Sequence, residues 1–142
     1  MPSATRQAPT VAVFNASEDT VAFVRLFFEG QGFHVIGQSW PAFDPVRAEV
    51  ANAFLSQHCV DVVIFDVSLP YPENWQHFVD FKKLLDGRKV PVVLTTTNER
   101  ALRDLVGSTD ALEIVGKPYD LDQLAIAVRT AMQRMAGSES SS

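Results

Sequence analysis

Short runs of β-branched and other apolar residues alternate along the chain with segments in which apolar residues recur at helical spacing. Five runs are typical of strands, at residues 10–14, 34–38, 60–65, 90–95 and 113–115. After each run comes a segment whose apolar residues recur at helical spacing, at residues 18–30, 46–57, 75–85, 99–106 and 121–135. Because strand–helix alternation is typical of a parallel sheet covered on both faces, the sequence predicts an α/β fold with a doubly wound, five-stranded parallel sheet and five helices.

Local signals mark the ends of several elements. Ser17 is suited to cap the first helix, with acidic residues in the first turn, and Gly30 and Gly32 are suited to end it. The run from Val60 is apolar almost throughout, as expected for a strand buried on both faces, and it stops at Asp66. The last helix has one apolar face, formed by Leu121, Leu124, Val128, Ala131, Met132 and Met135.

Length and composition indicate one folded unit. The chain has 142 residues, of which 46% are hydrophobic and 20% charged, so it can bury a core. Residues 1–9 and 136–142 are small and polar, and we expect disordered tails there around a domain at residues 10–135. On this length we expect no separate output domain.

Charge and cysteine content narrow the class of protein. The formal net charge of −5, with no stripe of Lys and Arg, argues against nucleic-acid binding. The longest apolar runs have strand length and no targeting signal is visible, so no membrane association is expected. A single cysteine, Cys59, excludes an internal disulfide framework and fits a reducing compartment. We therefore expect a cytoplasmic protein.

Three polar residues follow predicted strands and carry the candidate chemistry. Asp66, Thr96 and Lys117 come after the third, fourth and fifth strands. Open parallel sheets place their ligand sites at the carboxyl ends of the strands. Each residue alone could be a helix cap or a solvated side chain, but a carboxylate, a hydroxyl and an ammonium at one edge form a site suited to handling an anion.

In these residues and the segments around them, the sequence resembles the receiver domains of two-component response regulators. The resemblance covers Val11 to Met135 and rests on the segments 66–70 (DVSLP), 91–96 (PVVLTT) and 117–119 (KPY). It implies the flavodoxin-like strand order 2-1-3-4-5. It also implies that Asp66 accepts a phosphoryl group from a histidine kinase or phosphotransfer protein, that Thr96 donates a hydrogen bond to it, and that Lys117 pairs with its charge.

The chain departs from the family pattern at the metal site and at the switch. The family holds Mg²⁺ with two acidic residues after the first strand, where this chain has Asn15 and Ala16. The remaining ligands would be Asp66, one oxygen of Asn15 and a backbone carbonyl of Ser68, so we expect Mg²⁺ binding to be weak or absent. The aromatic residue that the family usually has three positions before the lysine is Ile114 here.

Two functions remain open. The first is a single-domain receiver in phosphorelay signal transduction, phosphorylated on Asp66, that signals by docking to a downstream protein or as a homodimer. The second is a degenerate receiver that binds a partner independently of phosphorylation. A small α/β enzyme is disfavoured, since the first turn lacks the glycines of nucleotide-binding loops. By resemblance, the docking face carries Arg100, Arg103, Asp104, Asp122 and Arg129, and the segment 39–45 with Trp40 and Phe43 is a second candidate partner surface.

Overall fold

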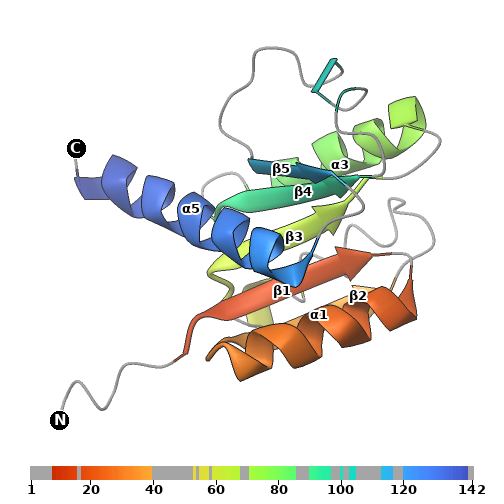
Figure 1. Ribbon diagram of the computed structural model, residues 1–142. Helices are drawn as coiled ribbons and strands as arrows, with labels where there is room; N and C mark the ends of the chain where they lie inside the picture. Colours follow the sequence, from red (N-terminus) through yellow and green to blue (C-terminus); the bar gives the residue numbers. More distant parts are fainter. Residues whose placement is uncertain are drawn as a thin grey trace, which may run out of the picture.

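Five parallel strands form one sheet in the order β2-β1-β3-β4-β5 (Figure 1). The structure is a computed structural model that describes residues 8–15, 17–39, 53, 55–57, 59–67, 71–85, 90–96, 100, 103–104, 113–116 and 120–140. The strands are β1 (Thr10–Asn15), β2 (His34–Ser39), β3 (Val62–Asp66), β4 (Val92–Thr96) and β5 (Glu113–Gly116). They lie close to their predicted bounds. The doubly wound sheet and its strand order are therefore confirmed.

Helices lie on both faces of the sheet. In Figure 1, α1 (Glu18–Gly30) and α5 (Leu121–Ser140) cover one face, and α3 (Tyr71–Leu85) lies on the other. Further helical residues are Ala53, 55–57, Arg100 and 103–104. They fall within the other two predicted helices, most of whose residues lie outside the described part of the chain, as does the segment 40–45.

Two helix boundaries differ from the predictions. α3 begins at Tyr71 rather than Trp75, because Pro72 sits in the first turn, where its missing N–H has no intrahelical partner to lose. α5 continues to Ser140 and so includes residues 136–140, which were expected to be part of a tail. Small polar residues indicate poor packing, but a helix that is already nucleated extends through them at little cost. No described helix is long and apolar enough to span a membrane.

The ends of α1 agree with the predictions. Ser17 is its N-cap, and the Ser17 hydroxyl accepts a hydrogen bond of 3.2 Å from the backbone N–H of Thr20. After Gly30 the chain turns through Gln31 and Gly32, whose φ of +91° suits a residue without a Cβ. The N–H of Phe33 then donates to the carbonyl of Phe28 at 3.0 Å, which closes the turn into β2.

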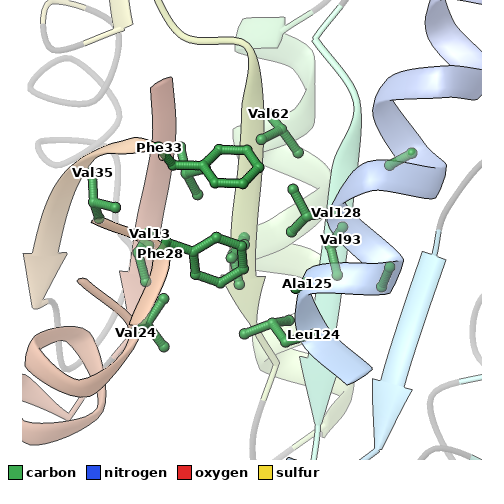
Figure 2. Packing of buried hydrophobic residues seen from close by; sticks show 14 of the residues in the cluster. Val13, Val24, Phe28, Phe33, Val35, Val62, Val93, Leu124, Ala125 and Val128 are labelled. Atoms are coloured by element: carbon green, nitrogen blue, oxygen red, sulfur yellow. The ribbon is translucent and has the colours of Figure 1, made fainter. Parts of the chain in front are cut away.

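The face of the sheet covered by α1 and α5 has a continuous apolar core. Figure 2 shows the rings of Phe28 and Phe33 over this face, with Leu124 and Val128 of α5 on the other side of the cluster. The two rings contact edge to face, with centroids 5.2 Å apart. Strand residues of this core are Val11, Val13, Val35, Val62, Ile64 and Val93.

The opposite face has an aromatic core. Phe81 of α3 lies 4.9 Å from the ring of Phe14 on β1 and 5.0 Å from that of Phe65 on β3. Phe78 is 5.2 Å from both Phe65 and the ring of Trp75. Phe14 and Phe65 are the last residues before Asn15 and Asp66, so the carboxyl ends of β1 and β3 rest on packed rings.

Candidate functional site at the carboxyl ends of the strands

Three polar residues lie at the carboxyl ends of three neighbouring strands, on the same face of the sheet. Asn15 and Asp66 are the last residues of β1 and β3, and Thr95 is the last but one of β4. Successive side chains of a strand alternate between faces, so residues two apart share one. Asn15, Asp66 and Thr95 therefore continue the rows that α1 and α5 cover, formed by Val11 and Val13 on β1, Val62 and Ile64 on β3, and Val93 on β4. The polar edge begins where these apolar rows stop.

Asp66 and Thr95 are direct neighbours in the β3–β4 register. The Thr95 hydroxyl donates a hydrogen bond of 2.6 Å to Oδ1 of Asp66. One residue further along β3, the N–H of Val67 donates to the Thr95 carbonyl at 2.8 Å, which fixes the backbone of Thr95 beside the carboxylate. Thr95 is fully buried, whereas Asp66 is half-buried and keeps access to solvent.

Thr96, the threonine named from the sequence, is also fully buried. By alternation it continues the row of Val92 and Leu94, which faces the aromatic core rather than the α1–α5 side. The structure thus brings Thr95 to the carboxylate, and its hydrogen bond with Asp66 was not foreseen. The only signal in the sequence was a run of adjacent threonines, which leaves the register open by one residue. The role of Thr96 toward a phosphoryl group stays a prediction.

Asn15 is buried, and its side chain bonds the N-cap residue of α1. Its Oδ1 accepts a hydrogen bond of 2.8 Å from the N–H of Ser17, whose hydroxyl accepts in turn from Thr20. Short Asx side chains commonly bond the backbone two residues on in this way. The carbonyl oxygen that could ligate a metal is therefore already an acceptor within the fold.

The described donor set does not fit a tightly held divalent cation. Within the described ranges, no three His, Cys, Asp or Glu side chains form a group able to hold a metal ion. Oδ1 of Asp66 and Oδ1 of Asn15 both accept protein hydrogen bonds. Glu18 and Asp19 are exposed in the first turn of α1, where acids favour the helix dipole.

Several predicted site residues are not placed. Lys117, Ser68 and Ala16 lie outside the described residues. Ile114, at the position of the family's switch aromatic, is half-buried and packs against the aromatic core. Their roles toward a phosphoryl group therefore stay predictions.

Arg129, in the predicted docking face, has partners within the fold. Arg129 of α5 donates a hydrogen bond of 3.1 Å to Oε1 of Gln31. Its guanidinium also lies 5.8 Å from the centroid of the Phe33 ring. Arg129 thus links α5 to the α1–β2 connection, on the core face of the sheet that α1 and α5 share.

Comparison with known proteins finds response regulators. The chain is 22% identical over 126 residues to the response regulator GtcR of Aneurinibacillus migulanus, covering 88% of this chain and 48% of that protein. It is 29% identical over 85 residues to the swarming motility regulation protein RssB of Serratia marcescens, covering 58% and 37%. The chain therefore spans about half or less of the length of these relatives. No family model matches the sequence.

Solved receiver structures superpose on most of the chain. The signal receiver domain of an HD domain-containing protein from Pseudomonas fluorescens Pf-5 has a TM-score of 0.71 at 15% identity, covering 96% of this chain and 95% of that one. A response regulator receiver protein from Sinorhizobium medicae has a TM-score of 0.67 at 19% identity, covering 90% and 97%. The chain therefore has the fold of receiver domains, and a curated protein that its sequence resembles over most of its length is a response regulator.

Proposed function

We propose that the chain is a phosphoaccepting receiver, in which Asp66 takes a phosphoryl group from a histidine kinase or phosphotransfer protein in the cytoplasm. The observation that carries the proposal is the position of Asp66. It ends the central strand β3, it is half-buried, and a hydroxyl on the neighbouring strand holds its carboxylate at 2.6 Å. A nucleophile with a fixed orientation and access from solvent is what transfer to a carboxylate requires.

In the proposed reaction an Asp66 oxygen forms a bond to phosphorus while the bond between phosphorus and the donor's leaving atom breaks. Three equatorial oxygens then carry negative charge, and catalysis consists mainly of stabilising them. We propose that Lys117 supplies a positive charge and Thr96 a hydroxyl for this purpose. The downstream partner is a protein that distinguishes the two states of the site.

We further propose that Mg²⁺ contributes little to this site. The site offers the ion one carboxylate and one neutral amide oxygen, and Oδ1 of each side chain already shares its electron density with a protein hydrogen bond. A hard dication prefers several anionic oxygens and otherwise retains its waters. Phosphorylation of Asp66 should therefore depend only weakly on millimolar Mg²⁺.

The test is intact-mass measurement after incubation with acetyl phosphate, with and without Mg²⁺. The wild type should gain about 80 Da, the mass of one phosphoryl group, and Asp66→Ala should gain nothing. Asp80→Ala is the matched control, because Asp80 is an exposed aspartate on α3 that contacts Gln76 and Lys83 of the same helix. Equal adducts in wild type and Asp66→Ala would place the phosphoryl group elsewhere and reject the proposal.

A second function is favoured by the Thr95–Asp66 hydrogen bond itself. A carboxylate that is already held, next to a site lacking the acidic pair, also suits a module with a single conformation. In that case acetyl phosphate leaves the wild type without an adduct. Asp66→Asn, which keeps an acceptor oxygen for Thr95, then binds the partner as the wild type does.

A further inference from the structure

We infer that Thr95 is a positioning residue that holds the unmodified Asp66 carboxylate and shortens the lifetime of the aspartyl phosphate. The inference rests on the proposed phosphorylation of Asp66. It adds to that function a residue that sets how long the signal lasts. It also assigns different effects to the two adjacent threonines at the end of β4.

The geometry fixes both partners of this hydrogen bond. Thr95 and Asp66 are paired across β3 and β4, and the Val67 N–H holds the Thr95 carbonyl at 2.8 Å. The hydroxyl is fully buried and lies 2.6 Å from Oδ1, a distance typical of a bond to an ionised carboxylate. Its orientation therefore follows from the strand register and does not depend on a mobile loop.

The strength of this bond changes with the chemical state of Asp66. The unphosphorylated carboxylate spreads a full negative charge over its two oxygens. After phosphoryl transfer through Oδ2, Oδ1 becomes the carbonyl oxygen of a mixed anhydride and accepts a weaker hydrogen bond. The Thr95 hydroxyl thus stabilises the unmodified state more than the phosphorylated one.

Hydrolysis reverses the change in charge. Water forms a bond to phosphorus, the bond between phosphorus and the Asp66 oxygen breaks, and the carboxylate and inorganic phosphate are released. Because negative charge returns to the carboxylate in the transition state, the Thr95 hydroxyl stabilises that transition state relative to the aspartyl phosphate. Removing the hydroxyl should therefore slow dephosphorylation.

Thr96 serves as the internal comparison. It carries the same side chain one residue along, but by alternation it lies on the side of the aromatic core. The resemblance assigns Thr96 a hydrogen bond to the phosphoryl oxygens, which stabilises the phosphorylated state. Neither that role nor its place on the other face puts the Thr96 hydroxyl against Oδ1 of Asp66, so its loss should not slow dephosphorylation, whereas loss of the Thr95 hydroxyl should.

The experiment compares Thr95→Val, Thr95→Ser and Thr96→Val with the wild type. Each protein is phosphorylated with acetyl phosphate, the donor is removed, and decay of the phosphorylated mass is followed. Thr95→Val should decay roughly three- to tenfold more slowly, as expected for losing part of one hydrogen bond to a charged group. Thr95→Ser, which keeps the hydroxyl, should restore decay close to that of the wild type.

Equal or faster decay in Thr95→Val overturns the inference and leaves the proposed function intact. Slower decay in Thr96→Val to the same extent also overturns it, because the effect would then belong to any lost hydroxyl. A wild type that gains no adduct rejects the proposed function, and the kinetic role falls with it.

A double-mutant cycle of Thr95→Val with Asp66→Ala in urea unfolding tests the hydrogen bond itself. The two substitutions together should change the unfolding equilibrium constant at least about threefold less than the product of their separate effects. Effects that simply multiply would overturn the inference.

Discussion

Gly37 of β2 lies so close to Val21 of α1 that a Cβ on Gly37 would overlap Cγ1 of Val21. Arg25 of the same helix is also within contact distance of that position. Because residue 37 has no side chain, α1 can pack closely on the edge strand of the sheet.

Gly37→Ala should destabilise the protein by about 1–3 kcal/mol, since a methyl group forced into a packed contact must displace the helix or Val21. Urea unfolding measures the change. Gly30→Ala is the matched control, because a Cβ there meets nothing within 4 Å, and better helix propensity should leave stability unchanged or slightly higher. Equal losses in both variants would show that the close approach at Gly37 is not what matters.

Phe81→Ala should lower the free energy of unfolding by about 3–5 kcal/mol. Phe81 is fully buried and contacts the rings of both Phe14 and Phe65, so its removal opens a cavity under the ends of two strands. Phe23→Ala provides the control for loss of an aromatic ring, since Phe23 is 66% exposed. Thermal and urea unfolding of the control should stay within about 0.5 kcal/mol of wild type.

Ser17→Ala should destabilise the protein by about 1 kcal/mol, because the hydroxyl that accepts the N–H of Thr20 is lost. Ser17→Asp keeps an acceptor and adds a favourable charge at the amino end of α1, so it should retain the stability of the wild type. Chemical denaturation of the three proteins distinguishes the cap from a general effect of substitution. A loss in Ser17→Asp as large as in Ser17→Ala would contradict this account.

Asn15→Asp should strengthen Mg²⁺ binding by roughly tenfold or more, because it adds an anionic oxygen near Asp66 and still offers an acceptor to the Ser17 N–H. Isothermal titration calorimetry measures the affinity. Glu18→Gln is a control for the nearby exposed acids and should leave the weak affinity of the wild type unchanged. Tight binding by the unmodified chain would show that Asn15 does not limit the site.

The sheet could be predicted from the sequence because a residue's burial in a strand or helix decides whether it is apolar. The order of apolar and polar positions along the chain therefore shows where the strands and helices lie. The site was only partly predictable. Asp66 stood out because it ends an apolar run, but the adjacent threonines 95 and 96 differ only in the face they occupy. That face depends on the pairing register of β4 with β3, a tertiary property.

Asn15 shows a different limit. The sequence shows that it carries no charge for a metal, but not that its oxygen accepts the Ser17 N–H. A hydrogen bond between residues two apart depends on how the chain leaves β1. The direction of that turn is set by the packing of α1 on the sheet, through contacts such as the one between Val21 and Gly37.

The hydrogen bond from the Ser17 N–H to Asn15 links the carboxyl edge of the sheet to the start of α1. A cation or solvent molecule bound to Oδ1 of Asn15 shares that oxygen with a backbone N–H at the start of α1 and draws electron density away from its hydrogen bond. Occupancy at the carboxyl edge of the sheet is thereby thermodynamically linked to the order of the first helical turn. Amide hydrogen exchange at Ser17 and Thr20 would therefore report on events at this site through the hydrogen bonds that begin the helix.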